Sequence, residues 1–168
     1  MPVSPLAPEL QVSRWFNAPA PLTLAGLRGR VVVIEAFQML CPGCVSHGLP
    51  QAQRVRQVFR REDVEVIGLH TVFEHHAAMT PVALRAFLHE YRIRFPVAVD
   101  SPGDGPLPRT MEAWGLQGTP TLVLFDARGR MRARHFGTVS DLALGAEIMA
   151  LVLEAGDSGH AAQGAAAP

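Results

Sequence analysis

Two cysteines, Cys41 and Cys44, are the only cysteines in the 168-residue chain, and only Pro42 and Gly43 separate them. Cysteines at this spacing can close a small disulfide ring. Cys41 comes just before the expected start of a helix, where free backbone N–H groups and the helix dipole favour its thiolate form. Cys44 follows one turn later, so its sulfur can reach back to Cys41. The motif predicts thiol–disulfide exchange, with Cys41 as the attacking thiol and Cys44 as the resolving thiol.

A carboxyl group lies close to this motif in the sequence. Glu35 is the one ionisable residue in the apolar run VVVIEAF, residues 31–37. Burial of a carboxylate is costly, so we expect the pKa of Glu35 to be raised. Glu35 could accept the proton of Cys44 during resolution, or it could be structural, facing a polar gap or pairing with an arginine. Both interpretations are open at this point.

Other cysteine chemistries agree less well with the sequence. Structural zinc needs four ligands, and the chain has no second cysteine pair. Peroxiredoxins have threonine or serine three residues before the reactive cysteine and proline seven before, whereas this chain has Gln38 and Ile34 there. A copper site would need the two cysteines and a histidine, since thiolate and imidazole both bind copper. Its candidate histidines are His47, His70, His75, His76 and His135. A peroxide reductase and a copper-binding chaperone are therefore the alternatives, and we expect neither a cofactor nor a metal.

The apolar pattern predicts the elements that position these residues. Residues 31–37 and 64–70 are expected to be buried strands, because they are apolar on both faces. The helix from Pro42 should run to about Arg60, with a kink at Pro50. Further strands are expected at residues 95–99, 121–125 and 131–136, the last two as a hairpin, and further helices at 82–91, 110–114 and from Ser140 or Asp141 to about Ala155. This order predicts an α/β fold with a central mixed sheet flanked by helices.

The chain is expected to form one domain over residues 10–155. Residues 1–9 are rich in proline and should be irregular, and residues 156–168 are small and polar and should form a disordered tail. The formal net charge is zero, which gives no indication of nucleic-acid binding. No segment is apolar and long enough to span a bilayer, and the N-terminus lacks a signal-peptide pattern. We expect a cytoplasmic monomer, or a periplasmic one if an export signal precedes these residues.

Two segments resemble the thioredoxin fold. VVVIEAFQMLCPGC resembles its active-site strand and motif, and GTPTLVLFDARGR resembles its cis-proline strand and the hairpin that follows. The sequences VIGLHTVFEHH, YRIRFPVAVD and MEAWG are similar to the inserted middle of the TlpA-like disulfide reductases, including the thioredoxin-like domains of the DipZ type. The resemblance covers about residues 20–153. It implies a thioredoxin-like fold with a helix and strand inserted between the second strand and the cis-proline strand.

The resemblance also implies roles for individual residues. The Thr119–Pro120 bond would be cis, although most bonds of this kind are trans. Pro120 would face the dithiol, and Thr119 would offer backbone hydrogen bonds to a bound substrate segment. Pro42 and Gly43 would belong to the same substrate-binding surface. Glu35 falls where thioredoxins often have a buried acid, which favours its role as proton acceptor.

The implied activity is that of a thiol–disulfide oxidoreductase working on protein disulfides through a mixed-disulfide intermediate. Its partners would be a protein thiol or disulfide and an upstream reductant, both unidentified. Two positions depart from the family pattern. Leu40 stands where tryptophan usually precedes the first cysteine, and the inner dipeptide is Pro-Gly, where thioredoxin has Gly-Pro.

Overall fold

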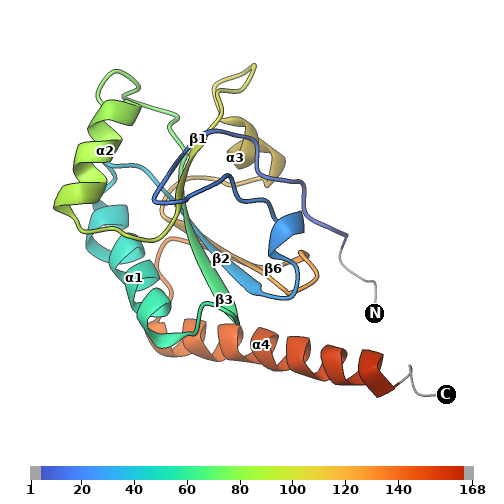
Figure 1. Cartoon of the computed structure of the whole chain (residues 1–168). Coiled ribbons are helices and arrows are strands. Elements are labelled where there is room, and N and C mark those ends of the chain that lie inside the picture. The colour runs from blue at the N-terminus through green and yellow to red at the C-terminus, as the bar shows by residue number, and fades with distance from the viewer. Residues whose placement is uncertain (1–4, 165–168) are drawn as a thin grey trace.

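The computed structural model describes residues 5–164, with the backbone alone from residue 158 onward. In chain order its elements are β1 (Val12–Phe16), η1 (Ala25–Leu27), β2 (Val31–Phe37), η2 (Cys44–Gly48), α1 (Leu49–Val58), β3 (Val64–His70), α2 (Pro81–Glu90), β4 (Val97–Asp100), α3 (Arg109–Ala113), β5 (Thr121–Phe125), β6 (Met131–Phe136) and α4 (Asp141–Gly164) (Figure 1).

One mixed sheet organises the fold. Its strand order is β1-β4-β3-β2-β5-β6. The inner strands β2, β3 and β4 are parallel, whereas β5 runs antiparallel to β2, and β1 and β6 are antiparallel edge strands. The predicted mixed sheet and the β5–β6 hairpin are confirmed. The inserted segment is also confirmed, because α2, β4 and α3 lie between β3 and β5 in the chain.

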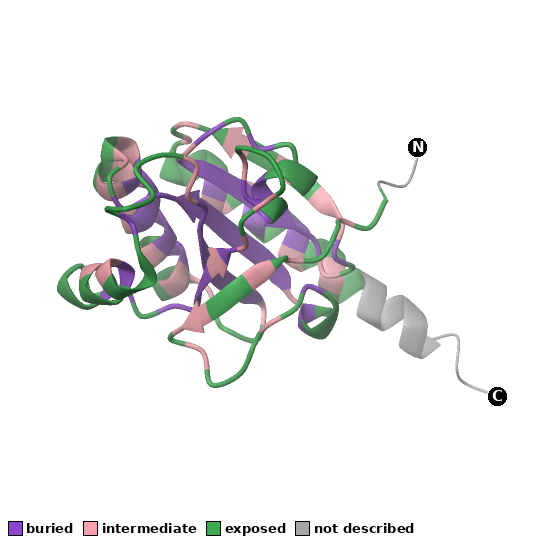
Figure 2. Ribbon diagram, turned by 90° about the horizontal axis from the view of Figure 1, so that it is seen from above, coloured by how far each residue is buried: buried purple, intermediate pink, exposed green. Residues whose placement is uncertain are grey.

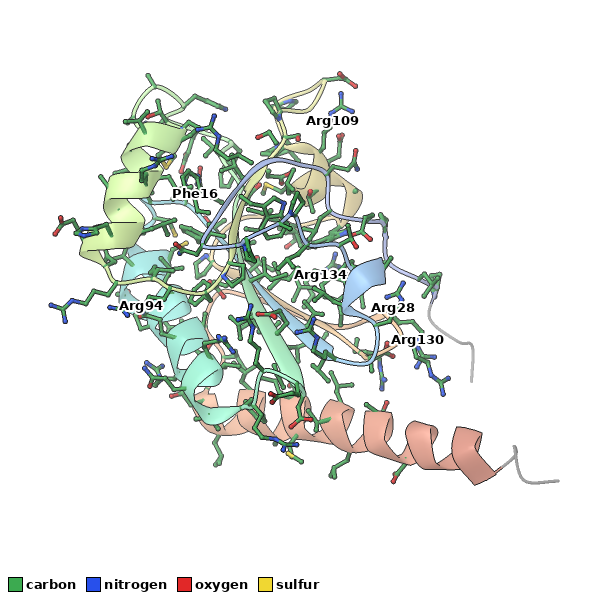
Figure 3. All side chains as sticks on the ribbon, in the orientation of Figure 1. Phe16, Arg28, Arg94, Arg109, Arg130 and Arg134 are labelled. Atoms are coloured by element: carbon green, nitrogen blue, oxygen red, sulfur yellow. The ribbon has the colours of Figure 1, made fainter. Side chains whose placement is uncertain are left out.

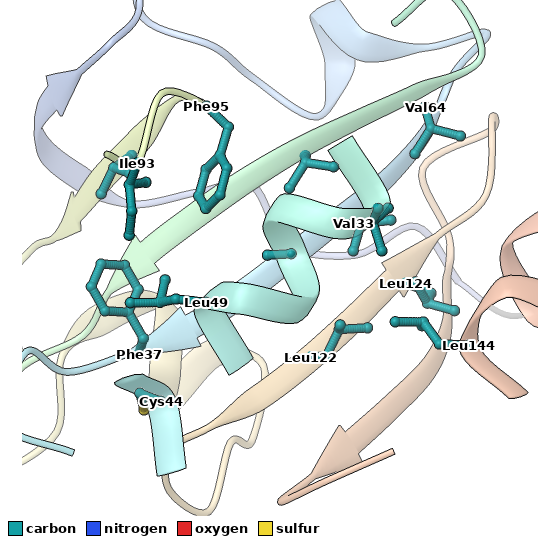
Figure 4. Close-up of a cluster of buried hydrophobic side chains, with 14 of the residues drawn as sticks. Val33, Phe37, Cys44, Leu49, Val64, Ile93, Phe95, Leu122, Leu124 and Leu144 are labelled. Atoms are coloured by element: carbon teal, nitrogen blue, oxygen red, sulfur yellow. The ribbon is translucent and has the colours of Figure 1, made fainter. Parts of the chain in front are cut away.

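The sheet separates two apolar clusters, and β2 contributes to both. Val31, Val33 and Phe37 belong to the cluster that includes side chains of α1, α2 and α4, whereas Val32 and Ile34 belong to the cluster that includes those of η1 and α3. Figure 4 shows part of the first cluster, with Cys44 at its edge. Successive residues of a strand point to opposite faces, and both faces of β2 are covered, so every residue of β2 is buried. The inner strands form the buried centre seen in Figure 2.

The helix that carries the dithiol changes its hydrogen-bond pattern after the second cysteine. The helix begins at Pro42, becomes a π-helix over η2, and continues as α1. The N–H of Leu49 donates to the carbonyl of Cys44, five residues back. Pro50 has no N–H, and its ring would crowd the carbonyl four residues before it in a regular α-helix. We attribute the π-helical turn to this proline, where the sequence predicted a kink.

The end of the chain differs from the prediction. The last helix does not stop near Ala155, because α4 extends to Gly164. This helix overlaps the segment 156–168, for which a disordered tail stays a prediction, and residues 165–168 lie outside the described residues. Adding residues to a helix that already exists needs no new nucleation, which explains why a small, polar sequence can remain helical.

The surface carries dispersed charge. Arg94, Arg109 and Arg130 extend from three different sides of the molecule (Figure 3). Arg130 and Arg132 both form ion pairs with the buried Asp126, at 2.7 and 3.3 Å. Over residues 5–164, no helix combines the length and apolar character needed to cross a membrane.

Candidate active site

The two cysteines lie at the point where the chain leaves β2 and enters the helix. Both are free thiols; Cys41 is partly exposed and Cys44 is buried. The N–H of Cys44 donates to Sγ of Cys41 over 3.3 Å, and Sγ of Cys41 lies 3.5 Å from the carbonyl oxygen of Thr119. One sulfur is therefore accessible to a partner molecule, and the other is held behind it.

The environment of Cys44 opposes its ionisation. Burial raises the pKa of Cys44 above its usual range, and a hydrogen bond with the Cys41 side chain raises it further. The Thr119 side chain and the backbone of Gln38 lower the pKa of Cys44, but burial has the larger effect. Cys44 consequently needs a proton acceptor before it can act as a thiolate.

Pro120 packs directly against the helix of the dithiol. The Thr119–Pro120 bond is cis, as the family resemblance implied. A Cβ atom placed on Gly43 would lie 3.2 Å from Cδ of Pro120, and one on Gly48 would lie 3.1 Å from its Cβ. The loop before β5 therefore meets this helix on both sides of Cys44.

The Glu35 carboxyl is buried beneath the same helix. The residue is 1 % exposed, and its Oε1 has no hydrogen-bond partner among the described residues. A Cβ atom on Gly48 would lie 2.9 Å from Cδ of Glu35, which places the carboxyl under the helix, four residues beyond Cys44. Desolvation raises the pKa of Glu35 to about 8. A carboxyl with this pKa can exchange a proton near neutral pH.

Replacement of Gly48 by alanine should destabilise the fold by about 1–3 kcal/mol, because the new methyl group has no room between the Glu35 carboxyl and Pro120. The free energy of unfolding in urea measures the effect. Gly145→Ala is the matched control: Gly145 lies within α4 and a Cβ there would have nothing within 4 Å. We expect the control to be neutral or stabilising, since alanine favours helix. Equal stability of the two variants would contradict the close approach at Gly48.

The histidines considered for copper lie in separate places. Nε2 of His70 accepts the backbone N–H of Met39 over 3.4 Å, and burial lowers the pKa of His70 to about 4. Nε2 of His135 lies 2.7 Å from Glu147, and His75 and His76 are exposed. In the part of the chain that the structure describes, no three histidine, cysteine, aspartate or glutamate side chains gather where they could hold a metal ion.

One buried residue beside the dithiol, Gln38, was not predicted to belong to the site. Gln38 is 2 % exposed, and its backbone carbonyl accepts the N–H of Cys41 over 3.2 Å. The indication in the sequence was that a polar residue, Gln38, directly follows the apolar end of β2. That signal could not identify its partners, which lie 35 and 36 residues away in the loop after β3.

Comparison with known proteins gives a consistent result. A crystal structure described as a thioredoxin-like superfamily protein is 65% identical, with a TM-score of 0.86, over 88% of this chain and 96% of that chain. A thiol-disulfide isomerase from Corynebacterium glutamicum is 51% identical, with a TM-score of 0.84, over 89% and 96% of the two chains. These likenesses confirm the thioredoxin-like fold.

Curated relatives extend beyond this chain. The protein DipZ of Mycobacterium bovis is 28% identical over 134 residues, which are 78% of this chain and 18% of that protein. The chain thus spans less than a fifth of the length of that relative. The model of the Redoxin family matches residues 3–146, which include both cysteines, Glu35 and the cis-proline loop. On this match, together with the fold, the chain belongs to the redoxin family.

Proposed function

We propose that this chain is a thiol–disulfide oxidoreductase that acts on protein disulfides through a mixed disulfide at Cys41. The observation that carries the proposal is the pair of unlike sulfurs: Cys41 is partly exposed, Cys44 is buried, and the N–H of Cys44 donates to Sγ of Cys41. An accessible attacking thiol backed by a protected resolving thiol is the arrangement that disulfide exchange requires. The similar Corynebacterium glutamicum protein is described as a thiol-disulfide isomerase, which supports the same class of activity.

The reaction has two exchange steps. The Cys41 thiolate attacks one sulfur of the substrate disulfide, forming a mixed disulfide and releasing the other substrate sulfur as a thiolate. Cys44 then loses its proton and attacks Sγ of Cys41, which breaks the mixed disulfide and releases the second substrate thiolate. The substrate is reduced by two electrons, and the enzyme leaves as the Cys41–Cys44 disulfide. An upstream dithiol must return the pair to its reduced form.

Glu35 is the proton acceptor in this proposal. Its buried carboxyl lies under the helix that carries Cys44, and burial raises its pKa to about 8. The ionised fraction is small but significant at neutral pH, so the carboxylate can take the Cys44 proton and later return it. Among the described residues, no arginine forms an ion pair with Glu35, which favours the proton-transfer role over the structural one.

The substrate segment would bind beside the partly exposed sulfur. The Thr119 carbonyl is within 3.5 Å of Sγ of Cys41, and Pro120 lies against Gly43. Pro42 is exposed on the same helix start. We assign substrate binding to the backbone of Thr119 and to Pro120, Pro42 and Gly43.

The monomeric state and the cytoplasmic location are still predictions from the sequence.

Replacement of Cys44 by serine tests the proposal directly. We expect this variant to attack a disulfide substrate normally but to remain linked to it, because the resolving sulfur is missing. Mass spectrometry under non-reducing conditions should find Cys41 joined to the substrate, and added dithiothreitol should release it. Absence of the linked species, with turnover equal to that of the unsubstituted protein, would show that Cys44 does not resolve the intermediate.

Neither alternative function gains support from the site. Gln38 has no hydroxyl group to hold a peroxide beside Cys41, and its side chain is hydrogen-bonded to the loop after β3. Ile34, where peroxiredoxins have proline, is buried in β2. For copper, His70 is held by Met39 and His135 by Glu147. Disulfide exchange is therefore the function that the geometry supports best.

A further inference from the structure

An open pocket lies near the dithiol, at the edge of the sheet where the parallel strands end. It has a volume of about 310 Å³ and is formed between two loops of the inserted segment, residues 71–80 after β3 and residues 101–108 after β4. Both loops lie at the top of the molecule in Figure 1. In open α/β sheets, ligands bind outside the carboxyl ends of the strands, which is where this pocket lies.

The strand register places the pocket close to the dithiol. Phe37 at the end of β2 pairs with His70 of β3, and His70 pairs with Val99 of β4, which lines the pocket. Neighbouring strands are about 4.8 Å apart, so Val99 lies about 10 Å from the strand end that leads to Cys41. The loop after β3 is fixed to the same strand end, because the N–H of Thr71 donates to the carbonyl of Phe37 over 3.1 Å. A substrate held at Cys41 is therefore within reach of the pocket.

The wall of the pocket is mainly apolar. Its apolar side chains are those of Val72, Met79, Val99 and Leu107, together with four prolines. The carboxylate of Asp100 also lines the pocket, but Asp100 is 5 % exposed and already accepts three hydrogen bonds, at 2.8 to 3.0 Å, from Thr71 and from the start of α3. Because this carboxylate is satisfied within the fold, it does not need a charged ligand. The pocket consequently suits an apolar side chain.

The loop after β4 is fixed in a shape that keeps the pocket open. The N–H of Arg109 donates to the carbonyl of Ser101 over 2.9 Å, and its Nε donates to the carbonyl of Pro102 over 3.0 Å. A Cβ atom on Gly103 would collide with the carbonyl oxygen of Leu107, so the two halves of the loop pass close to each other. A binding site that is already formed loses less conformational entropy when a ligand enters it.

We propose that this pocket receives an apolar side chain of the protein substrate, a few residues away from the cysteine that Cys41 attacks. The inference rests on the proposed disulfide exchange and names a feature of its substrates. The Thr119–Pro120 loop leads into β5, which lies on the other side of β2 from β3 and β4, so a substrate segment that contacts both this loop and the pocket passes over Cys41.

The geometry sets the spacing that such a substrate needs. An extended chain advances about 3.3 Å per residue, so a distance of 10 Å or somewhat more corresponds to about three to five residues. The substrate segment must be extended to reach both Cys41 and the pocket. Disulfides in unfolded or extended segments should therefore react faster than disulfides held inside a folded domain.

The test uses peptides that differ only in the position of one leucine. Each peptide has a single cysteine in a sequence of serine and glycine, and is joined to a second copy of itself by a disulfide. Pre-reduced protein is mixed with each peptide, and the loss of its free thiols is followed by acid quenching. With the leucine about three to five residues from the cysteine, the second-order rate constant should be about tenfold higher than without it. Equal rate constants for every leucine position would overturn the inference.

Val72→Asp should abolish this preference for leucine, because the new carboxylate would lose water when the leucine docks beside it. Val152→Asp is the matched control. Val72 and Val152 are both half-buried valines packed against the same apolar cluster, but Val152 lies in α4. We expect the control to keep the tenfold preference. A preference that survives in Val72→Asp would show that the leucine binds elsewhere, and the inference would be wrong.

Thr80→Asp keeps the test decisive if Val72→Asp does not fold. Thr80 lines the pocket and caps α2 by accepting the N–H of Ala83 over 3.2 Å, and aspartate is an equally good cap. Ser140→Asp is its control, because Ser140 accepts the N–H of Ala143 over 3.2 Å near the start of α4. The leucine preference should fall by about threefold or more in Thr80→Asp alone. An unchanged preference would contradict the inference, whereas failure of the unsubstituted protein to react with any of the peptides would count against the proposed function.

Discussion

Cys41→Ser should lower the turnover of a model protein disulfide by on the order of a thousandfold or more. The partly exposed sulfur of Cys41 is the only one that a substrate can reach, because Cys44 is buried. A serine hydroxyl at this position stays protonated near neutral pH and does not attack a disulfide as a thiolate does. Reduction of insulin by the protein and an excess of dithiol, followed by turbidity, measures the effect.

Ser46→Ala provides the control for Cys41→Ser. Ser46 is exposed on the π-helical turn, close to the dithiol in the chain, and its removal should leave turnover unchanged. Turnover by Cys41→Ser at the level of the control would mean that Cys41 is not the nucleophile. Loss of turnover in both variants would point to damage to the helix rather than loss of the sulfur.

Glu35→Gln should make the protein more stable, and the gain should grow as the pH rises. The pKa of Glu35 is about 8 in the fold against an ordinary value of 4.5, because burial disfavours its charged form. Between these two values the folded state binds more protons than the unfolded state, so the stability of the unsubstituted protein falls with rising pH. Glutamine carries no charge and removes this loss. The difference should be small below pH 4.5 and reach on the order of 3 to 5 kcal/mol above pH 8.

Urea unfolding across this pH range measures the difference, with Glu65→Gln as the contrast. Glu65 is also 1 % exposed, but its Oε2 accepts from Arg30 and Arg61 at 3.1 and 3.3 Å. Its neutralisation would leave two arginines without their buried partner and should destabilise the protein at neutral pH. A Glu35→Gln variant whose stability runs parallel to that of the unsubstituted protein at every pH would contradict the raised pKa.

The same substitution should change the pH dependence of catalysis. If Glu35 accepts the proton of Cys44, the rate of resolution should rise as the carboxyl ionises, through about pH 8. Glutamine cannot accept that proton, so the rise in the rate of resolution near pH 8 should be absent in Glu35→Gln. A Glu35→Gln variant that is more stable at high pH but still shows the rise in resolution rate near pH 8 would assign Glu35 a structural role only.

Features that depend on local sequence were the most predictable. The strand before the dithiol is fully buried as expected, because its apolar run has no polar alternation. The helix start at Pro42 follows from the preference of proline for the first turn. The cis form of Thr119–Pro120 could not be derived from the residues alone, and only the resemblance to thioredoxins implied it.

Features that depend on distant contacts could not be predicted from the sequence. Gly48 is needed because the helix passes close over Glu35 and Pro120, and no local sequence pattern predicts this close contact. Gln38 accepts from the Phe73 N–H and donates to Glu74, and these segments are brought together by the β2–β3 pairing. The edge strand β1 has only a weak signal in the sequence, because its burial is partial and its partner, β4, comes much later in the chain.

The place of β2 in the sheet has a consequence for motion. β2 has β3 on one side and β5 on the other, and both of its faces lie in apolar cores. Its amide protons should therefore exchange with deuterium only when the whole domain opens, whereas those of β1 should exchange through local fraying at the sheet edge. Cys41 follows the end of β2 at Phe37 after only three intervening residues, so the dithiol lies next to the segment that we expect to exchange most slowly. Local opening at the sheet edges should therefore leave the relative positions of the two sulfurs unchanged while the domain stays folded.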